Sequence, residues 1–247
     1  MQVLLLRHGR TPGNEKKRYI GVTDESLSPL GIEDCQRLGS LLLEQKRIQE
    51  KFTRIRTVVS PMKRCQESAQ ILLGIQGEVC NNSAMNQVKS CPEIYAVVNT
   101  QESIKRNWNG KYCTGLGVME VITENDLREC NFGIFENKNY LELQNEPIYQ
   151  QWIDSNGTMD FPQGDCLKEW KNRNVQAFQR QMACALKQQV DLSIFVVHGG
   201  TIMSIMECLE ERELGYYGYQ LRNGDGFWAV YEAGKLYQVV SVMTEKA

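Results

Sequence analysis

The chain contains only two histidines, and both stand in the same sequence context. His8 and His198 each follow a run of apolar residues, and each precedes a glycine. Arg7 comes directly before the first histidine, and Arg64 lies just past a third apolar run. A guanidinium group can bind two phosphate oxygens at once. A neutral imidazole can act as a nucleophile near neutral pH. If the three runs are neighbouring strands, these side chains predict a pocket for a small tetrahedral oxyanion, and phosphate fits it.

The apolar runs that position these residues are short and continuous, which is typical of strands buried on both faces. Helical periodicity alternates with them along the chain. Expected strands are 3–6, 56–59, 194–197, 227–231 and 236–242, and expected helices are 29–46, 62–73, 165–189 and 201–209. This alternation predicts an α/β fold, a three-layer α/β/α sandwich with a central, mostly parallel sheet. In such sheets the functional crevice lies at the carboxyl ends of the strands, where the arginines and histidines fall.

The glycine after the second histidine is also a candidate for the pocket. Gly199 has no side chain, so its backbone N–H can approach an anion closely. The helix expected from Thr201 adds the partial positive charge of its N-terminus. We therefore expect Gly199 to bind phosphate.

Length and composition indicate one globular domain. The chain has 247 residues, of which 42% are hydrophobic and 23% charged. The polar segment 77–125 interrupts the alternation and carries three of the cysteines, with helical periodicity returning only at 118–122. We expect a single domain over 1–247 with an insertion lobe at about 77–125, which could cap the pocket and set specificity.

Charge and cysteine usage restrict the partners. The net charge of −2 provides no basic field, so nucleic-acid binding is not expected, and no apolar stretch approaches the roughly 18 residues of a membrane span. Nine cysteines without a C-x-x-C pair, and without a secretory segment before them, predict reduced thiols in a cytoplasmic protein. Metal ligands are not clustered, so no metal or other cofactor is expected. The expected partner is a small phosphorylated metabolite; no feature predicts an oligomeric state.

Four motifs resemble, in order, those of a known family. LRHGRT at 6–11, with Asn14, resembles the R-H-G-x-T-x-x-N opening of the histidine phosphatase superfamily, the phosphoglycerate mutase-like enzymes. SPMKRCQESA at 60–69 is similar to its arginine motif, LRECNFGIFE at 127–136 to its acid motif, and HGG at 198–200 to its second histidine motif. Segment 18–31 is similar to the α-ribazole phosphatase-like branch. The resemblance covers 3–73 and 126–209.

This resemblance implies a phosphatase that works through phosphohistidine. It implies that His8 is the nucleophile, and that Glu129 is first the general acid toward the leaving oxygen and then the base that activates water. The residues expected to hold the phosphoryl oxygens are Arg7, Asn14, Arg64, His198 and Gly199. His8 must then be neutral, with its other ring nitrogen donating to a fixed acceptor. Glu129 must be protonated, so we expect desolvation to raise its pKa against the pull of nearby cations.

Several positions depart from the family pattern and leave the exact substrate open. PQGDC at 162–166 stands where the branch often has P-G-G-E-S. Met203 stands where an arginine is common, and Arg10 where an acidic residue is common. The expected catalytic set is complete despite these changes.

Other interpretations of the same residues remain open. Glu124 or Glu136 could replace Glu129 as the acid, and Arg64 could be a surface ion-pair partner. Phosphoglycerate mutase activity shares every catalytic residue, although the S-x-W-N and F-T-G-W patterns of cofactor-dependent mutases are absent at 11–14 and 19–22. A non-catalytic phosphate-binding module is a further alternative. A cysteine-dependent phosphatase is excluded, because no cysteine has an arginine six positions later.

Overall fold

The central feature of the molecule is a seven-stranded sheet in the order β3-β4-β2-β5-β1-β6-β7. The structure, a computed structural model, describes residues 1–44, 52–73, 110–114 and 117–243. The strands of the described chain are β1 (Gln2–Arg7), β2 (Arg54–Val59), β3 (Gly110–Thr114), β4 (Gly117–Thr123), β5 (Leu192–Val197), β6 (Gly226–Glu232) and β7 (Lys235–Ser241).

The middle of the sheet is parallel. β1 pairs with β5, β5 with β2, and β2 with β4, all in parallel, whereas β3, β6 and β7 each join their neighbours in antiparallel fashion. Every residue of β5 is buried, which explains why its sequence is a continuous apolar run. The predicted α/β class with a mostly parallel sheet is confirmed.

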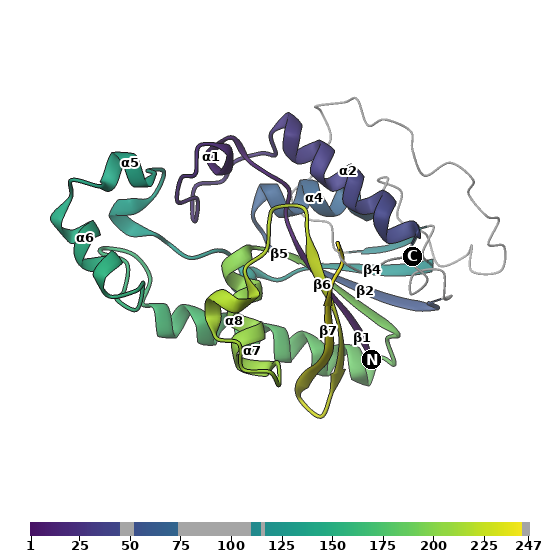
Figure 1. Cartoon of the computed structure of the whole chain (residues 1–247). Helices are drawn as coiled ribbons and strands as arrows, with labels where there is room; N and C mark the ends of the chain where they lie inside the picture. Colours follow the sequence, from purple (N-terminus) through teal and green to yellow (C-terminus); the bar gives the residue numbers. More distant parts are fainter. Residues whose placement is uncertain (45–51, 74–109, 115–116, 244–247) are drawn as a thin grey trace.

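Helices cover both faces of the sheet, α2 and α4 on one side and α7 and α8 on the other (Figure 1). The helices of the described chain are α1 (Pro12–Glu15), α2 (Pro29–Glu44), α4 (Lys63–Leu73), α5 (Tyr140–Leu143), α6 (Pro147–Asp154), α7 (Leu167–Lys187) and α8 (Gly199–Leu209). Short 3-10 turns occur at Asn125–Leu127, Gly133–Phe135 and Tyr216–Tyr219. No helix in the described ranges is long and apolar enough to cross a membrane.

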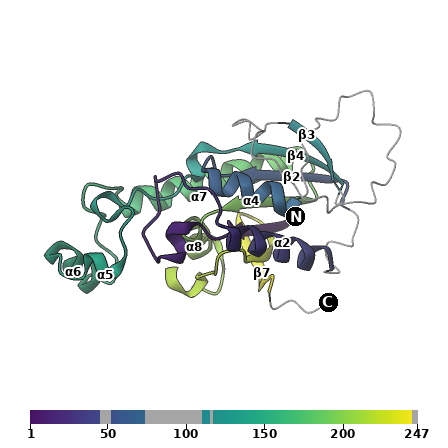
Figure 2. The ribbon, with the colours of Figure 1, turned by 90° about the horizontal axis from the view of Figure 1, so that it is seen from above.

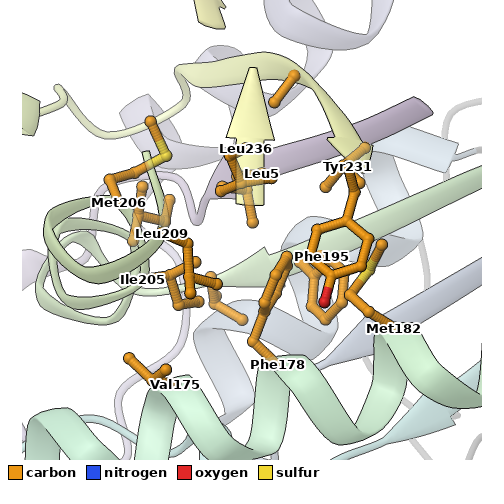
Figure 3. Packing of buried hydrophobic residues seen from close by; sticks show 14 of the residues in the cluster. Leu5, Val175, Phe178, Met182, Phe195, Ile205, Met206, Leu209, Tyr231 and Leu236 are labelled. Atoms are coloured by element: carbon orange, nitrogen blue, oxygen red, sulfur yellow. The ribbon is translucent and has the colours of Figure 1, made fainter. Parts of the chain in front are cut away.

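Successive side chains of β1 enter two separate cores. Leu4 and Leu6 join the apolar cluster beneath α2 and α4, whereas Leu5 joins the cluster beneath α7 and α8. In the second cluster Phe178 of α7 packs on Phe195 of β5 with ring centroids 4.8 Å apart (Figure 3). Burying a side chain of this size contributes about 1.5–3 kcal/mol to the free energy of unfolding. The strand that leads to the first histidine is therefore held rigidly from both sides.

A small lobe containing α5 and α6 lies away from the sheet, beyond the side toward which β1 runs (Figures 1 and 2). Its interior is an aromatic cluster in which Tyr149 stacks on Trp152 with centroids 6.2 Å apart. Trp170, in α7, belongs to the same cluster. The lobe is thus anchored to the main domain by shared apolar packing.

Several expected elements have different limits in the structure, as the helix expected at 165–189 does by spanning Leu167–Lys187. Segment 117–123 is not helical but forms β4, which pairs in parallel with β2, so the end of the expected insertion belongs to the sheet. Residues 77–109 of that insertion, and the expected end of the helix at 45–46, lie outside the described residues. α8 begins at Gly199 rather than Thr201, with His198 as its N-cap, and α4 begins at Lys63 rather than residue 62.

Candidate active site

Both histidines lie at the carboxyl ends of neighbouring parallel strands. His8 follows β1 and His198 follows β5, and the register pairs Arg7 with Val197. The adjacent strand β2 ends where Ser60 begins the loop to α4. The two imidazole rings are 5.3 Å apart between centroids. The sheet topology therefore brings together residues that are 190 positions apart in the sequence.

The ring of His8 is held in one tautomer. Its Nδ1 lies 2.7 Å from the carbonyl oxygen of Gly9, to which it donates, so Nε2 is left without a proton. The side chain is 3% exposed, and burial together with Arg64 and Arg7 lowers the pKa of His8 well below its usual value. His8 is therefore neutral at physiological pH, as the expected nucleophile must be.

His198 is fully buried and is held by a serine that the sequence analysis did not select. Its Nε2 lies 2.7 Å from the Ser60 hydroxyl, and its Nδ1 lies 3.9 Å from Oε2 of Glu129. Burial, followed by the charge of Arg64, lowers the pKa of His198 well below its usual value. The second histidine is thus neutral too, with Nδ1 on the side of the acid.

Glu129 is a buried carboxyl next to the second histidine. Burial raises its pKa, while a hydrogen bond from the backbone N–H of Cys130 at 3.0 Å and the charges of Arg64 and Arg7 work in the opposite direction. Desolvation is the largest effect, which is the direction expected from the sequence. A carboxyl with a raised pKa retains its proton more readily and can donate it to a leaving group.

The two alternative acids have other partners. Glu136 accepts hydrogen bonds from the backbone N–H of Thr23 and of two further loop residues. Glu124 binds the side chains of Gln181 and Arg180. Both carboxylates therefore hold loops or helices in place, and Glu129 is the candidate that lies against His198.

Arg7 and Gly199 pack directly against each other. Arg7 donates from Nη1 to the carbonyl of Leu221, whereas its Nε is buried without a partner. A Cβ atom at Gly199 would lie 3.1 Å from Cζ of Arg7. A side chain at residue 199 would therefore crowd the guanidinium of Arg7, whereas the sequence analysis selected Gly199 for the approach of its N–H to an anion.

Arg64 is completely buried, so the surface ion-pair interpretation is wrong. Its Nη1 donates to the carbonyl of Thr23 at 3.0 Å, and its Nη2 donates to those of Gly21 at 3.0 Å and Ile20 at 3.3 Å. Its Nε is buried without a partner. Arg64 therefore fastens the loop at 20–23 and retains N–H groups for a ligand.

Asn14 lies in the capping turn of α1. Its Oδ1 accepts hydrogen bonds from the backbone N–H of Thr11 and from Nδ2 of Asn223, each at 3.2 Å. With the oxygen engaged twice, the amide nitrogen is the group left to donate to a ligand. Asn223 is a second residue that sequence reasoning missed, because no motif points to it.

The structure thus brings together all of the predicted site residues. These are Arg7, His8, Asn14, Arg64, Glu129, His198 and Gly199. Two neutral imidazoles, a buried carboxyl, a buried arginine and a half-buried arginine are suited to bind a phosphoryl group and to supply a proton to its leaving group. Among the described residues, no group of three or more histidine, cysteine, aspartate or glutamate side chains is placed to hold a metal ion.

Comparison with known proteins agrees with this geometry. The chain is 25% identical over 209 residues to phosphoglycerate mutase-like protein 4 of Arabidopsis thaliana, covering 83% of this chain and 70% of that protein. It is 22% identical to a 2,3-bisphosphoglycerate-dependent phosphoglycerate mutase of Pseudoalteromonas atlantica, covering 84% and 83%. The fold is similar to that of the alpha-ribazole phosphatase from Shigella flexneri, with a TM-score of 0.62, 18% identity and coverage of 96% and 93%. The family model of the histidine phosphatase superfamily (branch 1) matches residues 3–84 and 110–240, so the chain belongs to that superfamily.

Proposed function

We propose that this protein is a phosphomonoesterase that hydrolyses its substrate through a phosphohistidine on His8. The observation that carries the proposal is the hydrogen bond from Nδ1 of His8 to the Gly9 carbonyl, which leaves Nε2 free as a nucleophile. The imidazole is buried and within the electrostatic influence of Arg64 and Arg7, so it is neutral and close to positive charge. That combination suits attack on an anionic phosphoryl group.

In the first step Nε2 of His8 attacks phosphorus, and the bond to the ester oxygen breaks. The proton of Glu129 passes to that oxygen, so the alcohol leaves neutral. Arg7 and Arg64 neutralise charge on the transferred oxygens. If the Ser60 hydroxyl donates to Nε2 of His198, Nδ1 of that ring carries a proton and can donate to one of them.

In the second step a water molecule attacks phosphorus, and Glu129, now a carboxylate, takes its proton. The bond between nitrogen and phosphorus breaks, His8 returns to its neutral form, and inorganic phosphate leaves. Each group ends in the state in which it began. The steps use only side chains of this chain, so we propose that turnover needs no metal.

We propose a small phosphorylated metabolite in the cytoplasm as substrate. The motif similarity of segment 18–31 makes an α-ribazole phosphate the first metabolite to test. A second candidate is phosphoglycerate mutase activity, which is favoured by the similarity to a phosphoglycerate mutase-like protein and to a phosphoglycerate mutase. A mutase must return the phosphoryl group to an acceptor before water removes it, so the two activities differ in whether free phosphate accumulates.

The proposal is tested by phosphate release from an aryl phosphate in excess EDTA. We expect release by the wild type and none above background by His8→Ala, because the alanine has no nucleophile. Release at the wild-type rate by His8→Ala would overturn the mechanism. Absence of release, with interconversion of phosphoglycerates, would establish the mutase instead. Phosphate binding without either reaction would establish a binding module.

A further inference from the structure

A segment near the C-terminus holds the loop that carries the nucleophile. β6 pairs antiparallel with β1, and the register ends with Leu6 opposite Gly226. The residues before β6 therefore run beside the residues after β1. The backbone N–H of Arg7 donates to the carbonyl of Asp225 at 2.9 Å, and that of Gly224 donates to the carbonyl of His8 at 3.1 Å.

Asn223 adds side-chain hydrogen bonds to this backbone contact. Its Nδ2 lies 3.2 Å from the carbonyl oxygen of His8 and 3.5 Å from that of Gly9. The same nitrogen lies 3.2 Å from Oδ1 of Asn14. One amide group therefore faces three acceptor oxygens, two of them on the nucleophile loop.

Two of these acceptor oxygens, the Gly9 carbonyl and Oδ1 of Asn14, bear directly on the proposed phosphohistidine chemistry. The Gly9 carbonyl is the group to which Nδ1 of His8 donates, and that bond selects the tautomer with Nε2 free. Oδ1 of Asn14 must be engaged for the Asn14 amide nitrogen to face a ligand. Asn223 contacts both, and its contact with His8 is to the backbone carbonyl oxygen rather than to the ring.

The turn that presents this amide has little freedom. Gly224 has φ of +64°, which favours glycine, and a Cβ atom there would lie 2.6 Å from Cβ of Asp34. Asp34 in turn holds Arg10 through hydrogen bonds of 2.6 and 2.9 Å. The backbone around Asn223 is therefore fixed by its surroundings.

We propose that Asn223 is a positioning residue that fixes the His8 tautomer and orients Asn14 toward the phosphoryl group. This inference rests on the proposed phosphohistidine chemistry. A single amide donor achieves both effects because its acceptors belong to the nucleophile loop and to the capping turn of α1.

The most informative variant is Asn223→Asp, which keeps the shape of the side chain and replaces its Nδ2 donor by an oxygen acceptor. Asn145→Asp is the matched control, because Asn145 is exposed on the α5–α6 lobe and undergoes the same chemical change. We expect Asn223→Asp to lower kcat about 10- to 100-fold, since small misplacements of a reacting group cost that much. We expect KM to change less than kcat, and Asn145→Asp to retain both.

The pH profile separates positioning from a general loss of structure. A carboxyl group facing three acceptor oxygens is disfavoured in its charged form, so its pKa is raised, and its protonated form regains one donor. The ratio of variant to wild-type kcat should therefore rise as pH falls. A loss of folding would instead appear as a lower thermal midpoint without recovery in acid.

Nitrogen NMR of the two histidine rings gives a readout that needs no substrate. In the wild type we expect His8 to carry its proton on Nδ1, and in Asn223→Asp we expect a mixture of both tautomers. An unchanged tautomer, together with kcat within twofold of an active wild type, would overturn the inference. An inactive wild type with the expected shift in tautomers would leave the positioning role standing and would reject the proposed function.

Discussion

At the scale of single residues, burial has opposite effects on the pKa values of the proposed nucleophile and the proposed proton donor. It lowers the pKa of His8, because the imidazolium is the charged form, and it raises the pKa of Glu129, because the carboxylate is the charged form. The same pocket therefore keeps the proposed nucleophile neutral and favours the protonated form of the proposed proton donor. The sequence predicted both roles from motifs, but it could not show that Ser60 holds the ring of His198, since that contact joins β2 to β5.

A depressed histidine pKa makes stability depend on pH. The unfolded chain binds a proton at His8 below about pH 6.5, whereas the folded protein does not until well below that value. The contribution of the neutral, buried histidine to the free energy of unfolding is therefore fully present above about pH 6.5. It is lost as pH falls, by about 1.4 kcal/mol per pH unit for each such histidine. The raised pKa of Glu129 makes the free energy of unfolding change with pH in the opposite direction. The contribution of His8 is therefore isolated by comparing the wild type with a variant that lacks this ring alone.

The measurement is urea unfolding of the wild type and His8→Gln between pH 7 and pH 5. We expect the wild type to lose more stability across this range than His8→Gln, because the variant lacks one titrating ring. Equal losses in both proteins would contradict a neutral, buried His8.

At the scale of elements, apolar pattern predicted most of the sheet and its helices, because buried parallel strands are continuous apolar runs. It failed at 117–123, where a short apolar run reads equally well as helix or strand, and pairing with β2 decides the outcome. It also placed the start of α8 two residues late, because the helix begins with two glycines, which have low helix propensity, after the N-cap His198. Asn223 was not predicted, because its contact with His8 depends on an antiparallel pairing across 215 residues.

A matched pair of glycine substitutions is available at Gly224, in the turn before β6, and at Gly215, the N-cap of the 3-10 turn Tyr216–Tyr219. Gly224 and Gly215 both have positive φ, of +64° and +73°, but only Gly224 has neighbours within 4 Å of a built Cβ atom. We expect Gly215→Ala to cost about 1–2 kcal/mol from the backbone alone. Gly224→Ala should cost more, because Asp34 must also move.

Chemical unfolding measures both costs, and kcat of each variant provides the functional comparison. Gly224→Ala should lower kcat because it displaces Asn223, whereas Gly215→Ala should retain it. If the two variants lose equal stability and keep equal activity, the turn at Gly224 does not fix the position of Asn223.

At the scale of the whole molecule, the site is assembled from both ends of the chain. The segment after β1 meets the segment before β6, while α4 contributes Arg64 and the loop after Asn125–Leu127 contributes Glu129. The rigid sheet beneath them is packed on both faces, which keeps these groups in place without a ligand. The α5–α6 lobe lies beyond the side toward which β1 runs (Figure 1).

The most direct measurement is detection of the covalent intermediate. Wild-type protein is mixed with a phosphorylated substrate, quenched in base, in which phosphohistidine survives and acyl phosphates do not, and digested for mass spectrometry. We predict one phosphoryl group on the peptide that contains His8, and none in His8→Ala. Phosphate turnover by the wild type with no label on His8, or with the label on another residue, would contradict the account.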